Sequence, residues 1–347
     1  MNVRTFPDGR DLPDFAPTCP GEPLADAATC TRLMCASQWF PLDSAVSALL
    51  AGRRSFLQRH ERTGLRTGLL HASGWLVRWY EGSGEAVAEE WQRLQSDPHV
   101  HGLRLLHRSQ GAGALRDGVQ FATLHAGDDI EVVARRLRGV ARERSQGWDA
   151  EPAEIWQALA APCLLAHPGS LGFVGRRDLV AIASEDNEAY ESVRALARAS
   201  RRRVAYQRFA GSELERADLG AAYVDLALEN TVVTRVHALP RRSLATSVPM
   251  VGLRDVECLL VLLGAREPRA QALLAQAREL LASLPQPPAV VVAGRCSVTR
   301  GEARDVLGDA PMQSLEVLPA GDEPAALVWQ LLQAGRQGRW SLERLAA

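Results

Sequence analysis

The stretch that most constrains the fold is residues 67–82, TGLLHASGWLVRWYEG. It consists of an apolar run, the dipeptide Ser73-Gly74, a second apolar run and a stop at Glu81-Gly82. Glycine readily adopts the positive φ that a tight hairpin turn requires, so we expect the turn at Ser73-Gly74. The sequence therefore predicts two apolar strands joined by a two-residue turn.

The composition is that of a globular protein with sizeable cores. The chain has 347 residues, of which 46% are apolar and 23% are charged, and its formal net charge is −1. This length predicts two or three domains, and the near-zero charge gives no general footprint for nucleic acid. Because the sequence has no apolar run of about 18 residues and no secretory signal, we expect a cytoplasmic protein without a membrane span.

The sequence contains no lysine, so all 40 basic residues are arginine. This excludes a Schiff-base lysine and the lysine of a phosphate-binding loop. None of the six cysteines forms a CxxC pair, and we expect reduced thiols rather than disulfides or a zinc site. We interpret His99 and His101, which follow Asp97, as part of a polar loop, and we expect no metal site.

The pattern along the chain predicts four segments. Residues 1–29 are rich in Pro, Asp and Ala and indicate a flexible leader. Residues 30–125 are expected to form a first domain, residues 126–168 a helical connector and residues 170–338 a second domain.

Within the first domain the hydrophobic spacing predicts two helices and two strands beside the hairpin. The strands are expected at residues 31–39 and 103–107, and the helices at residues 43–60 and 86–95.

In the second domain, short apolar runs alternate with segments of helical period. Strands are expected at residues 179–183, 204–209, 232–239, 256–264, 288–294 and 314–319, and helices at residues 185–199, 271–284, 299–307 and 323–334. This alternation predicts a doubly wound α/β domain with a largely parallel sheet.

Residues 30–125 resemble a BLUF domain, the flavin-binding module that senses blue light. The resemblance rests on Thr67-Gly68-Leu69-Leu70, on Trp79-Tyr80-Glu81-Gly82, on a helix that ends near His60 and on Asp97 after the second helix. It implies a ferredoxin-like α+β fold with a slot for a non-covalent flavin; an unrelated ferredoxin-like domain is the alternative.

The same resemblance implies that the residues of flavin photochemistry are lost. The family's tyrosine falls at Ser37, its asparagine at Glu61 and its glutamine at Arg78, whereas His60 matches a residue that some members carry. Serine is a poor one-electron donor, and arginine has only donors, so it cannot replace a rearranging amide. Two interpretations remain: Arg78 and Glu61 contact flavin or another ligand, or they form an ion pair that fills the emptied slot, which we favour.

Residues 179–334 resemble a Ras-like small GTPase, particularly the bacterial gliding-motility type. The position of the phosphate loop falls at residues 183–190, ASEDNEAY, which lack glycine and lysine and carry three carboxylates. We interpret Ser184 as the N-cap of the following helix. The guanine motif falls at residues 293–296, AGRC, which lack the aspartate. The resemblance thus implies a pseudo-GTPase.

Together these observations favour a non-enzymatic regulatory or assembly adaptor that acts through protein–protein contacts. We expect no cofactor, with FAD disfavoured. The partners implied by the resemblance are a small GTPase, a roadblock-type regulator or a second copy of this chain. Two alternatives stay open: an FAD-binding blue-light photoreceptor with an α/β output domain, and an atypical guanine-nucleotide-binding switch.

Overall fold

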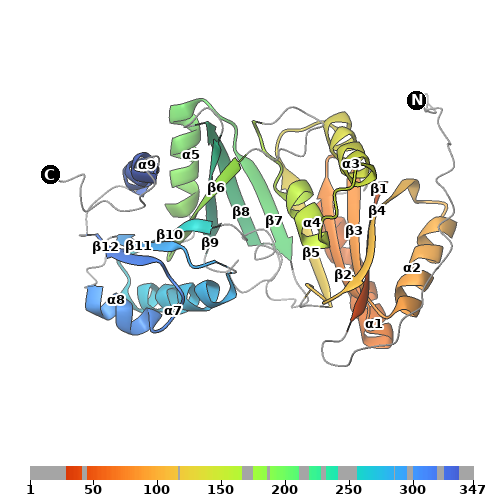
Figure 1. The fold of residues 1–347 in the computed structure, drawn as a ribbon, viewed down its shortest axis with the longest axis horizontal. Coiled ribbons are helices and arrows are strands. Elements are labelled where there is room, and N and C mark those ends of the chain that lie inside the picture. The colour runs from red at the N-terminus through yellow and green to blue at the C-terminus, as the bar shows by residue number, and fades with distance from the viewer. Residues whose placement is uncertain are drawn as a thin grey trace.

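The computed structural model describes residues 29–40, 45–115, 118–165, 175–185, 188–210, 219–227, 232–240, 256–284, 286–294, 300–318 and 324–335. The predicted leader lies almost entirely outside this part of the chain. Figure 1 shows strands that run through the whole molecule, with helices packed on both sides of them. No helix in the described ranges is long and apolar enough to cross a membrane.

The first half of the chain contains five strands and four helices within the described residues. They are β1 (Cys30–Gln38), α1 (Ala45–Thr63), β2 (Arg66–Ala72), β3 (Trp75–Gly82), α2 (Gly84–Ser96), β4 (His101–Gly111), β5 (Val119–His125), α3 (Ile130–Ser145) and α4 (Pro152–Ala160).

The second half continues with strands and helices that largely alternate. Its described elements are β6 (Gly175–Ala183), α5 (Glu188–Ser200), β7 (Ala205–Ala210), β8 (Leu219–Ala227), β9 (Val232–Pro240), β10 (Val256–Leu263), α7 (Glu267–Ser283), β11 (Ala289–Gly294), α8 (Arg300–Leu307), β12 (Ser314–Val317) and α9 (Pro324–Gly335).

All of these strands belong to one twelve-stranded sheet of order β12-β11-β10-β6-β9-β8-β7-β5-β2-β3-β1-β4. The strands from β9 to β12 pair in parallel, as expected, whereas antiparallel pairs predominate elsewhere. The two halves meet where β5 pairs antiparallel with β7, from Phe121↔Ala210 to His125↔Tyr206. Because the sheet continues through this junction, the predicted division into two domains is not confirmed.

The hairpin expected at residues 67–82 is present, with Ala72 opposite Trp75. Its turn residues Ser73 and Gly74 have φ values of 42° and 82°. Two positive φ angles match a right-handed twist of the flanking strands, and glycine adopts such an angle at Gly74 without steric cost. The turn is also tethered, because the Ser73 hydroxyl donates to the carbonyl of Asp128 at 2.7 Å.

The helices form two layers, one on each face of the sheet. On one face a single apolar core runs through both halves and includes Trp79, Trp156 and Leu259, with residues of α3, α4, α7 and α8. On the other face α1, α2 and the pair α5/α9 cover separate clusters. The shared core means that apolar packing, in addition to the sheet, connects the two halves.

Helix α4 contacts both halves of the sheet. In the first half, the rings of Trp156 and Trp79 lie 5.8 Å apart. At its other end, the carbonyl of Ala160 accepts from Gln207 Nε2 at 2.6 Å, and that of Ala161 accepts from Arg235 Nη1 at 2.6 Å. A cation at a helix C-terminus is favourable for the helix dipole, so this arrangement stabilises the end of α4.

Arg235 lies in a buried network beneath the chain that follows α4. Both Arg235 and Asp225 have side chains that are 0% exposed, and Arg235 Nε and Nη2 donate to the Asp225 carboxylate at 2.6 and 2.8 Å. The guanidinium also lies 4.1 Å from the centroid of the Tyr223 ring, whose hydroxyl donates to the carbonyl of Pro162. This bidentate pair ties β8 and β9 to the end of the connector.

Candidate functional site

Two of the four predicted slot residues are in contact. Ser37 on β1 and Arg78 on β3 are both buried, and Arg78 Nη1 donates to Ser37 Oγ at 2.6 Å. Arg78 lies opposite Cys35 in the antiparallel register, so Ser37 and Arg78 occupy the same face of the sheet. This face is the one covered by α1 and α2.

The other two predicted residues lie apart from this contact. His60 Nδ1 is 3.1 Å from the carbonyl of Leu65, and a Cβ at Gly118 would come within 2.5 Å of the His60 ring. Glu61 is exposed and forms no hydrogen bond or ion pair with the described residues. The predicted Arg78–Glu61 ion pair is therefore wrong, since Glu61 lies on the exposed side of α1, whereas Arg78 is buried and donates to Ser37 and to the carbonyl of Leu76.

A buried carboxylate that the sequence reasoning missed links α1 to α2. Glu90 is 3% exposed, and its Oε1 accepts from Arg59 of α1 at 3.0 Å. Arg93, one turn further on α2, donates to both oxygens of Glu90 at 2.7 and 3.0 Å. The i,i+3 spacing of Glu90 and Arg93 was the only sequence signal for this cluster.

A hollow of about 440 Å³ opens between the end of α1 and α2. Its lining consists of Arg59, Arg62, Thr63, Leu65, Ala86, Glu89, Glu90, Gln92, Arg93 and Ser96. None of the four predicted residues lines it. The hollow between the two helices is thus lined mostly by polar side chains, among them Glu90 and its partners Arg59 and Arg93.

Two side chains of the sheet beneath these helices have pKa values that are raised by burial. Burial raises the pKa of the Cys35 thiol to about 12, although the nearby Arg78 lowers it. Burial, aided by the charge of Glu90, raises the pKa of Tyr80 well above its ordinary value. Both groups therefore stay neutral at physiological pH, and Cys35 is not activated as a nucleophile.

The Glu81-Gly82 pair of the motif has a structural role. Glu81 is 1% exposed, and its carboxylate accepts from the amides of Ala114 and Leu115 at 2.9 and 2.8 Å. It therefore fixes the loop between β4 and β5, which explains the acidic residue at this position without any ligand.

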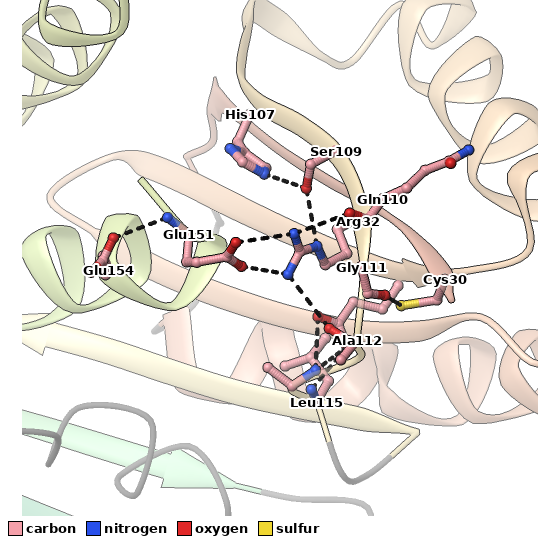
Figure 2. A network of polar contacts seen from close by, with 12 residues as sticks. Cys30, Arg32, His107, Ser109, Gln110, Gly111, Ala112, Leu115, Glu151 and Glu154 are labelled. Atoms are coloured by element: carbon pink, nitrogen blue, oxygen red, sulfur yellow. Dashed lines mark hydrogen bonds and ion pairs between the residues drawn. The ribbon is translucent and has the colours of Figure 1, made fainter. Parts of the chain in front are cut away.

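On the face of the sheet opposite α1 and α2, Arg32 is the centre of a polar network (Figure 2). Its guanidinium donates to Ser109 Oγ at 3.0 Å and to Glu151 Oε2 at 2.5 Å. Ser109 Oγ lies 2.7 Å from His107 Nε2. Because Glu151 is the N-cap of α4, this network holds the start of that helix to β1.

The histidine of this network gives a pH-dependent prediction. Burial lowers the pKa of His107 to about 4, from an ordinary value of 6.5; Arg144 and Arg32 add to the effect, whereas Glu151 and Asp149 oppose it. The unfolded chain therefore binds a proton more readily than the native protein between these values, and the free energy of unfolding should fall as the pH drops from 6.5 towards 4.

We expect this loss to be smaller in a His107→Gln variant than in the wild type, as measured by urea unfolding across that pH range. A His99→Gln variant, changed at an exposed histidine, is the matched control. An unchanged pH dependence in His107→Gln would contradict the assignment.

At the position expected for a phosphate loop, Ser184 and Glu185 contact other parts of the protein. Ser184 Oγ accepts from the amide of Gly264 at 2.6 Å, and Arg269 pairs with Glu185 at 2.7 Å. Helix α5 begins at Glu188, so the predicted N-cap role of Ser184 is replaced by a contact to the end of β10. Residues 186–187 and 295–296 of the two predicted motifs lie outside the described residues.

No model of a known protein family and no curated protein matches the sequence. Similar solved structures include BlrB, a BLUF protein in its dark state, which is 20% identical over 27% of this chain and 72% of its own length, with a TM-score of 0.25. A bacterial light-regulated adenylyl cyclase is 12% identical over 34% of each chain, with a TM-score of 0.25.

A third similar structure is Klebsiella pneumoniae BlrP1 with FMN and cyclic diGMP. It is 13% identical over 83% of this chain and 95% of its own length, with a TM-score of 0.25. The chain thus spans about a third of the cyclase but most of BlrP1. Similarity at this level establishes no family membership.

Proposed function

We propose that this protein is a non-enzymatic regulatory or assembly adaptor that acts through protein–protein contacts. The observation that carries the proposal is the buried contact between Ser37 and Arg78. In a BLUF-like first half, this pair occupies the positions of the electron-donating tyrosine and the rearranging glutamine. Neither side chain can perform those steps, so the framework is kept without its photochemistry.

The second half is proposed to be a pseudo-GTPase. In support, six of its strands follow the order β8-β9-β6-β10-β11-β12, and β8 alone pairs antiparallel within this set. This is the largely parallel sheet that the alternation of strands and helices in this half predicts. Phosphoryl transfer needs positioned cationic and metal contacts, whereas the end of β6 presents Glu185 paired with Arg269 and the chain contains no lysine.

The proposed partners are proteins: a small GTPase, a roadblock-type regulator or a second copy of this chain. Such partners would bind to the surface of the protein rather than through a ligand-gated pocket. The class of partner follows from analogy between folds.

The proposal is tested on the full-length protein purified from its source cells without added ligands. The protein is denatured, and the released small molecules are separated by chromatography, while an intact sample is weighed by native mass spectrometry. We expect neither flavin nor guanine nucleotide in stoichiometric amounts, and an assembly mass that includes a protein partner or a second copy. A free monomer that carries stoichiometric guanine nucleotide would overturn the proposal.

A further inference from the structure

Strand β4 forms one edge of the sheet, and its outer side is open. It is the last strand in the sheet order and pairs with β1. Within the described residues, no hydrogen bond between backbone groups joins residues 101–111 to any element other than β1. With 11 residues β4 is long for an edge strand, whereas β12 at the other edge has 4. A long edge strand presents N–H and C=O groups to which another strand can add.

The end of β4 has the regular geometry that such an addition needs. Residues 107–111 pair with residues 30–34 without a shift of register. Towards its beginning the register of β4 shifts twice, and next to the first shift the carbonyl of Leu106 accepts from Arg144 of α3 at 2.6 Å. Bulges discourage further pairing at an edge, so we expect an added strand to pair with residues 107–111.

The two faces of the sheet differ in chemistry beside this edge. Arg104 is opposite Ala36, on the face covered by α3, and its guanidinium lies 5.5 Å from the centroid of the Trp75 ring. Leu105 is opposite Cys35, on the face covered by α2, and is 38% exposed. A strand that runs past these residues therefore meets a cation on one face and an apolar side chain on the other.

The positive charge on the α3 face is not balanced by a carboxylate. Burial and the charge of Arg138 on α3 lower the pKa of Arg104, and no acidic residue contributes to this shift. Among the described residues, neither Arg104 nor Arg138 takes part in an ion pair. Glu151, a carboxylate on the same face, is already paired with Arg32. Two neighbouring guanidinium groups are thus left for an anionic partner.

We propose that the outer edge of β4 binds an extended acidic segment of a partner protein, which adds to the sheet as a further strand. Backbone hydrogen bonds to β4 hold the segment, as in other cases of strand addition. Because side chains alternate between the faces of a strand, its acidic residues face Arg104 and Arg138 while its apolar residues cover Leu105. This inference rests on the proposed adaptor function and names the surface and the chemistry of one partner.

Charge favours such a segment over a second copy of this chain. A second copy joined edge to edge would bring Arg104, Arg108 and Arg138 close to the same three arginines of its partner. Like charges that face each other across a strand pair are destabilising. An acidic segment turns the same arginines into attractive contacts, which also speed its association.

The test uses the full chain and a fluorescent, capped peptide in which glutamate alternates with valine. The peptide is titrated to millimolar concentration at low salt, and amide hydrogen exchange of the protein is measured with and without it. We expect exchange in residues 101–111 to slow when the peptide binds. The double variant Arg104→Gln with Arg138→Gln should bind about fivefold more weakly. The matched control is Arg278→Gln, an exposed arginine of α7, for which we expect unchanged binding.

A second peptide, methylated at every backbone nitrogen, keeps the charges but cannot donate hydrogen bonds to β4, so it should not bind. Equal binding of the methylated peptide would mean non-specific attraction to surface arginines and would overturn the proposal. The absence of binding to the wild type overturns it too. So does slower exchange in residues 101–111 at rising protein concentration without peptide, because a second copy would then occupy the edge. If the double variant fails to fold, Arg138→Gln alone decides, and unweakened binding there contradicts the proposal.

The native mass measurement separates this inference from the adaptor function. A purified assembly that contains a partner protein, together with a peptide that does not bind, leaves the adaptor proposal standing and rejects only the β4 edge. A free monomer with stoichiometric guanine nucleotide rejects the adaptor proposal whatever the peptide does.

Discussion

Replacing Asp225 by alanine lowers the free energy of unfolding by about 3–5 kcal/mol. The substitution leaves the guanidinium of Arg235 buried at 0% exposure without its carboxylate. It also removes the acceptor for the amide of Leu164, which donates to Asp225 at 2.7 Å. The loss is measured by urea unfolding of the wild type and the variant at the same pH.

Two further variants separate the buried charge from the rest of the network. In a double variant, Asp225→Leu with Arg235→Met, we expect a smaller loss than in Asp225→Ala, because no uncompensated charge remains. Breaking the exposed pair Glu191–Arg194 by Glu191→Ala should change the stability by only about 0–1 kcal/mol. An Asp225→Ala variant as stable as Glu191→Ala would contradict this account of the network.

Replacing Trp156 by alanine is expected to lower the free energy of unfolding by about 3–5 kcal/mol. The side chain is 2% exposed and packs against Trp79 of β3, and a Cβ at Gly68 of β2 would lie 3.6 Å from its ring. Truncation leaves a cavity under α4, where the apolar core passes from one half of the sheet to the other.

The control for this variant is Trp329→Ala on α9, whose side chain is 39% exposed. It removes the same chemical group from a partly solvated position, so the loss should be clearly smaller. Denaturant unfolding at two wavelengths measures both variants. A loss for Trp156→Ala no larger than that for Trp329→Ala would show that α4 does not anchor the sheet.

Local features of the fold could be predicted from the sequence because their signals are local. The turn at Ser73-Gly74 has the positive φ angles that the dipeptide indicated. The apolar run in residues 256–264 forms the buried strand β10, as expected of a central parallel strand. In both places neighbouring residues alone determine the outcome.

The junction between the halves could not be predicted in the same way. The pairing of β5 with β7 joins residues 121–125 to residues 206–210, which are far apart in the chain. Taken alone, each half would leave β5 or β7 at the edge of its own sheet. The residues of such a strand do not indicate which other strand it pairs with, so the pairing depends on the packed structure. The expected two-domain division overlooked this pairing because each half has a complete element pattern by itself.

The candidate site was predicted only in part. The resemblance located Ser37 and Arg78, which do meet, because β1 pairs with β3 in a register that places both side chains on the same face of the sheet. It also placed Glu61 in the slot, whereas Glu61 lies on the exposed side of α1. Glu90 was missed, since the sequence alone does not distinguish a buried glutamate from an exposed one. Its burial is explained only by its arginine partners, which the structure shows.

The most direct test of the central claim is a light-minus-dark absorption spectrum of the full-length protein, recorded after incubation with excess FAD and desalting. The claim is that the BLUF-like half has kept its framework and lost flavin photochemistry, with Ser37 and Arg78 at the critical positions. We predict no spectral shift on illumination with blue light. A reversible red shift of a retained flavin band would contradict the claim and would identify the protein as a photoreceptor.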